Sequence, residues 1–220
     1  MGVSGQEGRS YRSPRRDQAA ADTRAAILSA ATRLFIERGY GRVTVADIAS
    51  EAAIAVPTVY ASTGGKAAIL ARLVHDAERD PIVGKSLEAI RASQSPDEVI
   101  RATAHGTRMD NERYHDLIQV MVSAGATDET ARATLRSSDR LYWETLEKTA
   151  IRLEELHALK DGLSVERATD VLWFYFGHRS WHLLNERKWS WSEAEQWLAE
   201  QASQALVPAG KWSPATRNRP

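Results

Sequence analysis

The 220-residue chain contains no cysteine. Disulfides, thiolate metal sites and cysteine nucleophiles are therefore excluded. Long apolar runs are also missing, since the longest, residues 171–177, is far too short to span a bilayer. The N-terminal residues include arginines but not the apolar core of a secretory signal. We therefore expect a soluble, cytoplasmic protein with no membrane partner.

No stretch of the chain alternates apolar and polar residues over the length of a strand. Apolar residues recur at helical spacing instead, which predicts an all-α fold. The first helix is expected over residues 22–38, because Ile27, Leu34 and Phe35 lie on one apolar stripe. Gly39 ends this helix, since glycine readily takes the left-handed conformation after a helical C-terminus.

Charge is balanced overall, with 29 Lys and Arg against 29 Asp and Glu, but it is unevenly distributed. Residues 1–76 hold ten basic and seven acidic side chains, whereas residues 77–220 hold nineteen and twenty-two. A basic front and an acidic back are typical of a DNA-binding head on a body that avoids DNA. A chance fluctuation of three charges explains the same numbers, so charge alone does not decide the function.

Two short helices follow the first one. Thr44 is placed to cap a helix that ends near residue 53, with Asp47 at the capping-box position. After a four-residue turn, Pro57 opens a second short helix, which ends at Ser62. This order is typical of a helix-turn-helix unit, whose second helix enters the major groove of DNA.

Between Gly39 and Lys66 the sequence contains GY, TVADIA, PTVY and then the lysine, in that order. This pattern resembles the DNA-binding region of the tetracycline-repressor (TetR) family of bacterial regulators. The chain departs from the family at Ile54, where the family has a turn glycine, and at Val56, where it has a capping serine. It also departs at residues 62–63, where the family often has His or Tyr followed by Phe.

The resemblance implies three kinds of contact with double-stranded operator DNA. Hydroxyls and an ammonium hold phosphates, small side chains of the second short helix face base edges, and two arginines of the N-terminal arm enter the minor groove. The residues are Arg15, Arg16, Thr44, Pro57, Thr58, Tyr60, Ala61, Ser62 and Lys66. Taken singly, Tyr60 is also readable as a core residue, Lys66 as a solvated lysine and Thr44 as a simple cap.

The remaining chain is expected to form a larger helical body. Helices are predicted over residues 66–80, 97–110, 112–124, 127–158, 164–187 and 192–206, the last with a capping box of Ser192 and Glu195. The expected domains are an unstructured basic arm (1–21), a helix-turn-helix DNA-binding domain (22–69), a helical ligand-binding and dimerisation domain (70–207) and an unstructured tail (208–220).

The predicted helix over residues 164–187 is apolar on nearly every side, so one domain face does not suffice to cover it. A second subunit is expected to cover the rest, as the resemblance also implies. The expected homodimer interface contains Trp173, Trp181, Leu184 and Trp197. Such a dimer sets two recognition helices about 34–36 Å apart, one turn of a palindromic operator. The alternative is a monomer with a tryptophan-rich core.

An effector pocket is expected among the helices of the body, lined by aromatic residues, methionines and a few polar groups that suit an apolar or aromatic small molecule. The candidates are His105, Met109, Tyr114, Met121, Tyr142, Trp143, Phe174 and His178. The same residues at helical spacing are also consistent with plain core. His178 and His182 have a zinc-binding spacing, but no third ligand is evident, so no metal or cofactor is expected.

The sequence therefore predicts a dimeric repressor that leaves its operator when a small molecule binds. No nucleophile elbow, phosphate-binding glycine loop or convergent carboxylate pair supports an enzyme. Two alternatives stay open. One is a helical carrier or enzyme with a vestigial DNA-binding head, and the other is an activator or a DNA-binding protein without a ligand.

Overall fold

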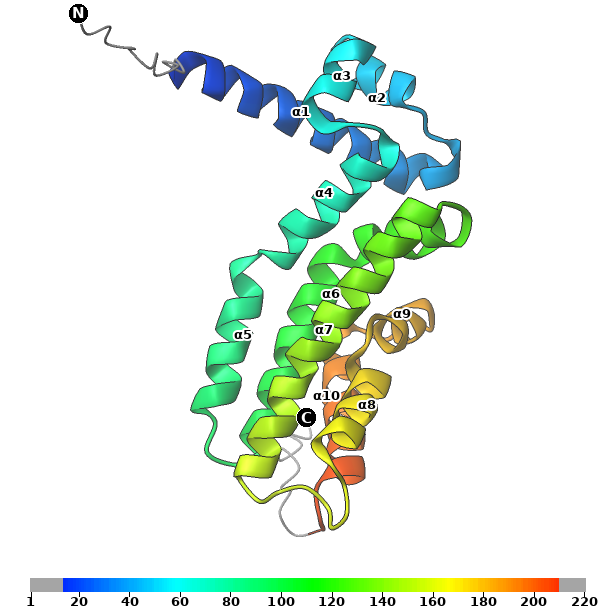
Figure 1. Ribbon diagram of the computed structural model, residues 1–220. Coiled ribbons are helices and arrows are strands. Elements are labelled where there is room, and N and C mark those ends of the chain that lie inside the picture. Colours follow the sequence, from blue (N-terminus) through cyan, green and yellow to red (C-terminus); the bar gives the residue numbers. More distant parts are fainter. Residues whose placement is uncertain (1–13, 210–220) are drawn as a thin grey trace, which may run out of the picture. The chain divides into compact units, whose positions relative to one another are not determined.

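The computed structural model describes residues 14–209 (Figure 1). Within that range the regular structure consists of ten α helices and one short 3-10 helix, without a strand, so the predicted all-α fold is confirmed. The chain divides into two compact units that meet at residues 70 and 71. We call residues 14–70 the head and residues 71–209 the body. The boundary expected from the sequence, between residues 69 and 70, lies one residue away.

The first helix is longer than expected. α1 spans Pro14–Arg38, so residues 14–21, assigned to an unstructured arm, are helical. These residues are mostly Arg, Gln and Ala, which favour helices, and Asp17 complements the helix dipole in the first turn. Apolar periodicity cannot detect such a segment because residues 15–21 are all exposed. The remaining predicted arm (1–13) and the tail residues 210–220 lie outside the described residues.

The head follows the predicted helix-turn-helix order. After α1 come the 3-10 helix η1 (Tyr40–Arg42), α2 (Val45–Glu51) and α3 (Val56–Thr63). Thr44 caps α2 through a reciprocal capping box, in which its hydroxyl accepts from Asp47 N and its own amide donates to the Asp47 carboxylate. The core beneath the helices consists of fully buried apolar side chains: Ile27, Leu34, Phe35, Ile48 and Val59.

The turn between α2 and α3 accommodates Ile54, which stands where the TetR family has a glycine. The residue in the left-handed conformation is Ala53, with a φ of 54°, and the amide of Ile54 donates to Ala49 O over 2.9 Å. The β-branched side chain therefore avoids the strained conformation that the family's glycine suggested. The cap of α3 is Ala55 rather than Val56, and α3 begins without a side-chain cap.

α4 (Lys66–Glu78) crosses the boundary between the two units, and the next helix was not predicted. α5 spans Pro81–Ala92, with Asp80 capping its first turn by accepting from the amide of Ile82. From the sequence, no helix was predicted between residues 80 and 97, although Pro81 is a residue type that can open one. In the structure the proline occupies the first turn, where its missing N–H leaves no hydrogen bond unmade.

α6 is a single helix over Pro96–Thr127, although two helices were expected there. The expected break at residue 111 is absent because Asn111 is satisfied inside the bundle, where its side-chain amide donates to Thr107 O over 2.8 Å. α7 then spans Glu129–Glu155.

The predicted helix over residues 164–187 is in fact two helices, α8 (Val165–Phe176) and α9 (His178–Glu186). Gly177 joins them with an extended backbone, and a side chain there would collide with the carbonyl oxygen of Trp173. α10 spans Trp191–Leu206, and its capping box is formed by Ser190 and Glu193, two residues before the predicted pair.

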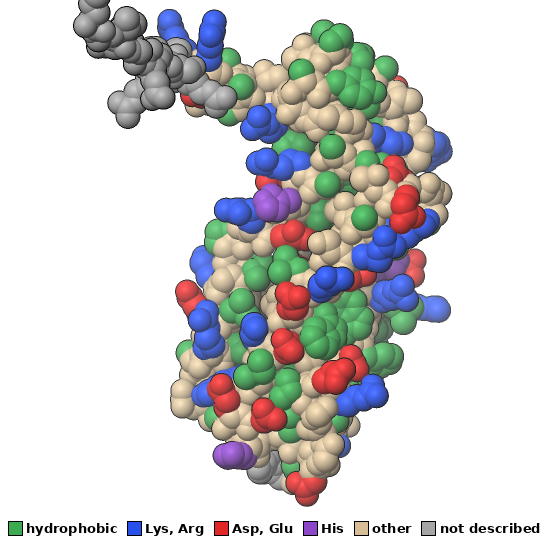
Figure 2. All heavy atoms as spheres, viewed as in Figure 1, with side chains coloured by type: hydrophobic (Ala, Val, Ile, Leu, Met, Phe, Trp, Pro, Cys, Tyr) green, Lys and Arg blue, Asp and Glu red, His purple; other side chains and the backbone are tan. Residues whose placement is uncertain are grey.

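Within the body, α6 and α7 lie side by side, with α5 on one side and α8, α9 and α10 on the other (Figure 1). Apolar side chains from these helices form one core: Ile90, Val99, Ile100, Leu146, Leu153, Leu172, Phe176, Trp181, Leu198 and Leu206. On the face shown in Figure 2, acidic and basic side chains are interspersed with small apolar areas. None of the described helices combines the length and apolar character needed to cross a bilayer.

Candidate DNA-binding surface and ligand cavity

The exposed face of α3 carries the residues expected at base edges. Pro57, Thr58 and Ala61 are exposed, while Val59 on the opposite face is fully buried and anchors the helix to α1 and α2. Tyr60 is 54 % exposed, so its interpretation as a core residue is wrong. α3 contains no charged residue, and its surface therefore offers hydroxyls and apolar groups to a partner.

Lys66 begins α4 and is held against the head rather than free in solvent. Its Nζ donates to Tyr40 O over 2.9 Å and lies 4.2 Å from the centre of the Tyr40 ring. Tyr40 in turn is buried against Phe35, with ring centres 5.3 Å apart. The ammonium group is therefore held against η1, with further N–H donors available for another partner.

The other residues of the predicted DNA surface lie in different surroundings. The Thr44 hydroxyl donates to the Asp47 carboxylate, and this hydrogen bond is the main reason that the pKa of Asp47 is lowered. Thr44 therefore acts as a cap, and its hydroxyl proton is already engaged. Ser62 is half-buried at the end of α3. Arg15 and Arg16 are exposed on the first turn of α1, a helix rather than the flexible arm expected from the sequence.

The body contains a cavity among α4, α5, α6, α7 and α9, with about 930 Å³ of empty space, part of it open to solvent. A mostly apolar hollow with a few polar groups is typical of small-molecule sites. Most lining residues are apolar: Val74, Ala77, Ile82, Val83, Leu87, Ile90, Leu117, Ile118, Met121, Leu141 and Leu146. The polar residues are Glu78, Ser86, Thr103, Thr107, Asp110, Tyr114, Ser138, Tyr142, Thr145, Thr149 and His178.

Half of the predicted pocket residues line this cavity: Tyr114, Met121, Tyr142 and His178. The other half do not, and these expectations were wrong as to position: His105, Met109, Trp143 and Phe174. On α6 the cavity face runs through Gly106, Asp110 and Tyr114, at successive four-residue steps. His105 and Met109 each precede a residue of this face by one position, which rotates them about 100° around the helix axis.

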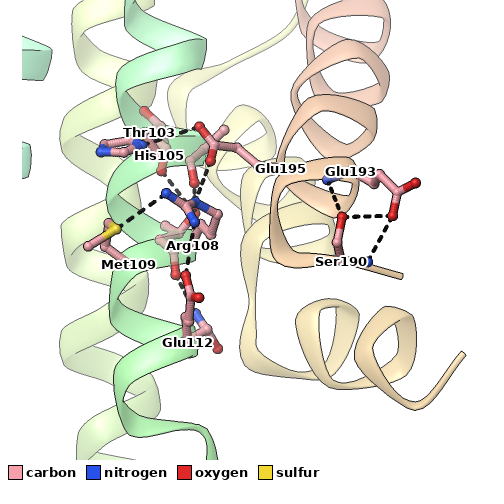
Figure 3. Close-up of polar contacts among 11 residues, drawn as sticks. Thr103, His105, Arg108, Met109, Glu112, Ser190, Glu193 and Glu195 are labelled. Carbon is pink, nitrogen blue, oxygen red and sulfur yellow. Dashed lines mark hydrogen bonds and ion pairs between the residues drawn. The ribbon is translucent and has the colours of Figure 1, made fainter. Parts of the chain in front are cut away.

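Figure 3 shows where that rotation places the neighbouring α6 residues. Glu195 of α10 forms ion pairs with Arg108, over 2.5 Å, and with His105, over 3.3 Å. Arg108 also pairs with Glu112 over 2.9 Å, and its guanidinium lies near the sulfur of Met109. Glu195, predicted as part of a capping box, therefore links α10 to α6.

Trp143 and Phe174, the other two residues wrongly predicted to line the cavity, lie at the surface. Trp143 donates its indole N–H to Asp170 over 3.4 Å. Phe174 is 71 % exposed, the most exposed large apolar side chain among the described residues. Since α8 turns this side chain outward, Phe174 belongs to the surface of α8–α10 rather than to the cavity.

A buried polar network borders the cavity and is centred on Asn111. Its side-chain amide donates to the Tyr142 hydroxyl over 3.2 Å, and its Oδ1 lies 3.0 Å from His178 Nδ1. The Tyr142 hydroxyl donates to Phe176 O over 2.9 Å, which satisfies a carbonyl left without a helical partner at the end of α8. Burial lowers the pKa of His178 to about 4, so the imidazole is neutral at pH 7.

His178 and His182 do not converge on a common point, since His182 Nε2 lies 3.5 Å from Glu186 and His178 contacts Asn111. The part of the chain that the structure describes contains no group of three or more His, Cys, Asp or Glu residues placed to hold a metal ion.

Sequence reasoning missed Asp110, which lines the cavity on α6. Burial, together with the nearby charge of Asp80, raises the pKa of Asp110 to about 6. Asp80 is in a different environment, because it accepts from the Tyr114 hydroxyl over 2.6 Å and pairs with Arg113 over 3.2 Å. The hydrogen bond from Tyr114 is the main reason that the pKa of Asp80 is lowered. The four-residue spacing between Asp110 and Tyr114 was the available sequence signal.

The predicted dimer residues fall into two groups. Trp181 is 0 % exposed, and its indole N–H donates to Phe176 O, so it belongs to the core of its own subunit and its assignment to the interface was wrong. Trp173 and Leu184 are half-buried, and Trp197 is 39 % exposed. The large exposed apolar side chains of α8–α10 and the turn before α10 are Phe174, Leu183, Trp189 and Trp197. Apolar periodicity identified these helices as unusually apolar but did not distinguish their inner from their outer residues.

The described fold and the exposed α3 define a protein of the helix-turn-helix class. Residues 27–73 match the family profile of bacterial regulatory proteins, tetR family. The head therefore matches the TetR family in sequence, and the described residues share their fold with solved structures of TetR-family regulators. The family is one of regulators and not of enzymes.

Solved structures of similar fold cover almost the whole chain. A complex of SmeT, from Stenotrophomonas maltophilia, with triclosan has a TM-score of 0.71 at 21 % identity, covering 90 % of this chain and 98 % of that one. NalD from Pseudomonas aeruginosa has a TM-score of 0.71 at 21 % identity, covering 87 % and 99 %. FadR from Bacillus subtilis with stearoyl-CoA has a TM-score of 0.69 at 18 % identity, covering 82 % and 98 %. No curated protein sequence is significantly similar to the chain.

Proposed function

We propose that this regulator is a cytoplasmic repressor that binds a palindromic operator as a homodimer and leaves it when a small molecule occupies the cavity of the body. The observation that carries this proposal is the combination, in one chain, of an exposed α3 with a mostly apolar cavity of about 930 Å³. A helix-turn-helix head reads DNA, and a cavity of this kind binds organic molecules.

The exposed surface of the head supports specific roles in DNA binding. Pro57, Thr58 and Ala61 contact base edges, where their small and methyl-bearing side chains fit against thymine. Tyr60 and Lys66 bind phosphates on either side of the groove. Because α3 carries no charge, the electrostatic part of the affinity comes from residues outside it.

Three predicted DNA residues take reduced roles in this proposal. The hydroxyl proton of Thr44 is engaged by Asp47, so Thr44 positions α2 rather than donating to a phosphate. Ser62 is half-buried and has a shorter reach than the His or Tyr of the family. Arg15 and Arg16 extend from a helix and reach the phosphate backbone that flanks the site, instead of entering the minor groove as a flexible arm.

The dimer interface is proposed on the outer side of α8–α10. Phe174, Leu183, Trp189 and Trp197 expose large apolar surfaces there, and the Trp189 and Trp197 rings lie 5.7 Å apart. Aromatic side chains of this type are enriched at the centres of protein interfaces. The half-buried Trp173 and Leu184 lie on the same helices and would contribute at the edge of this patch.

The ligand-dependent release is supported by the position of the cavity. α4 begins in the head with Lys66 and continues into the body, where Val74, Ala77 and Glu78 line the cavity. A ligand that prefers one position of α4 would also change the placement of the recognition helix. Structures of similar fold contain triclosan in SmeT and stearoyl-CoA in FadR, which supports a small organic effector here.

The first test is binding to the DNA upstream of the protein's own gene, by footprinting at two salt concentrations. We expect a protected palindrome whose half-sites lie about one helical turn apart. Tyr60→Phe removes only the exposed hydroxyl and should weaken binding at every sequence alike, whereas Thr58→Ala should alter the preferred bases. Salt-sensitive binding without a footprint would contradict specific operator recognition. Absence of any binding would favour the carrier with a vestigial head.

A further inference from the structure

Asp110 is an unusual residue in the wall of this cavity. It is partly buried on α6, lines a space that is mostly apolar, and receives no hydrogen bond or ion pair from the described residues. No lysine or arginine is found among the described residues that line the cavity. A partly buried carboxylate without a partner opposes folding, because it has lost part of its hydration and gained no hydrogen bond or counter-charge.

The charged and titratable groups around Asp110 do not balance the negative charge of its carboxylate. They are Glu78 from α4, Asp80 at the start of α5, Tyr114 on α6, Tyr142 from α7 and His178 from α9. Two of them are carboxylates, and Arg113 on the same helix is paired with Asp80. The field at Asp110 is therefore negative, and it disfavours an anion in the cavity.

The polar groups beside Asp110 also lack free donors. The Tyr142 hydroxyl donates to Phe176 O, and the Tyr114 hydroxyl donates to Asp80. Since the amide of Asn111 donates to Thr107 O and Tyr142, its Oδ1 is the acceptor for His178 Nδ1–H. The neutral His178 is therefore left with Nε2 as an acceptor. Tyr114, Tyr142 and His178 therefore have no O–H or N–H left to donate to a ligand, whereas His178 Nε2 accepts.

We propose that the cavity selects amphiphilic organic cations, whose apolar body packs against α4–α7 and whose protonated amine or similar group donates to Asp110. His178 Nε2 provides a second acceptor for the same group. This inference rests on the proposed function, because it names the class of effector for the cavity. It also gives Asp110 a function. Since no basic residue pairs with Asp110, the positive charge of the ligand balances its carboxylate.

The test uses three fluorescent dansyl sulfonamides that share an apolar body. Their five-carbon tails end in an amine (dansylcadaverine), a methyl group or a carboxylate. With the full-length protein at pH 7.5, we expect the amine to bind about tenfold or more tightly than the neutral probe, and the carboxylate most weakly. Asp110→Asn should abolish this preference while leaving the neutral probe bound. Asp116→Asn, an exposed aspartate on the same helix, is the matched control and should retain it.

The pH dependence offers a second readout. Because the pKa of Asp110 is about 6, the carboxyl becomes protonated between pH 7.5 and 5, and the amine probe should lose most of its advantage over that range. The pKa of His178, about 4, keeps that side chain neutral throughout. The neutral probe, and both probes on Asp110→Asn, should show a flat profile.

The outcomes separate this inference from the function on which it rests. Equal binding of the amine and neutral probes, or a preference for the amine that survives in Asp110→Asn, would overturn cation selection and leave the cavity as a ligand site. Failure of all three probes to bind at millimolar concentration would overturn both. Selective binding of the amine probe that also releases operator DNA would support both.

Discussion

The head and the body use their polar side chains in opposite ways. In the head they pair near the surface with close neighbours: Thr44 with Asp47, Arg33 with Glu51 over 2.6 Å, and Lys66 with Tyr40. In the body, Asn111, Tyr142, His178 and Asp110 lie inside, around a cavity. The head therefore has the features of a rigid element with one exposed working surface. The body gives up part of its possible stability to keep polar groups where a ligand reaches them.

The largest effect should come from truncating the tryptophan that the body buries completely. Trp181→Ala should lower the free energy of unfolding by about 3–5 kcal/mol, because it leaves a large cavity and removes a hydrogen bond to Phe176 O. Chemical denaturation followed by circular dichroism measures this loss. Trp197→Ala is the matched control: it should leave the folded subunit nearly as stable and instead weaken dimerisation, measured by analytical ultracentrifugation. Similar losses for both would contradict the division into inner and outer tryptophans.

The next effect concerns the network that closes the break between α8 and α9. Asn111→Ala removes the partner of His178 Nδ1 and the hydrogen bond that the Tyr142 hydroxyl accepts, at a cost of about 2–3 kcal/mol in unfolding free energy. Thermal unfolding of the whole chain measures it. Gln119→Ala, a change on the same helix outside the network and the cavity lining, should have little effect. If Asn111→Ala proved as stable as the parent, the network would not hold the helices together.

Asp110→Asn should act in the opposite direction and stabilise the ligand-free protein. A carboxyl whose folded pKa is raised from 3.8 to about 6 takes up protons on folding between these values, so its ionisation penalises the folded state fully above pH 6. The variant should gain about 1–2 kcal/mol in unfolding free energy at pH 7.5 and nothing near pH 4. Denaturant titrations at both pH values measure the difference. A variant less stable than the parent at pH 7.5 would show that Asp110 has a partner.

The smallest effect is expected in the head, at the turn between α2 and α3. Ala53 has a φ of 54°, a conformation that glycine adopts without strain. Ala53→Gly should therefore stabilise the head by about 0.5–1 kcal/mol, the left-handed strain less the added flexibility of the unfolded chain. Hydrogen exchange of α2 and α3 amides measures the head separately from the body. Faster exchange in the variant would indicate that flexibility outweighs strain.

Sequence reasoning described the head more closely than the body for a physical reason. The elements of the head are set by local signals: a capping box at Thr44, a proline in the first turn of α3 and a glycine with a φ of 78° after α1. The body lacks such signals at its decisive points. Asn111 lies within one long helix because its amide finds partners on other helices, and the sequence does not reveal those partners.

The same distinction explains the candidate sites. The DNA-facing residues of α3 were identified from a contiguous pattern, and the structure exposes Pro57, Thr58, Tyr60 and Ala61 together. The cavity depends on which side of α6 faces α5 and α7. A rotation of one residue separates Asp110 and Tyr114, which line it, from Met109, which does not.

By itself, the sequence determined that this protein is all helical, that its head is a helix-turn-helix unit, and which residues of that unit face outward, because caps, turns and apolar periodicity act over a few residues. The tertiary structure alone decided that Trp181 is internal while Phe174 is exposed, and that Asp110 lies unpaired in an apolar cavity. These are properties of packed helices, and the free energy of a buried side chain depends on partners that are distant in the chain.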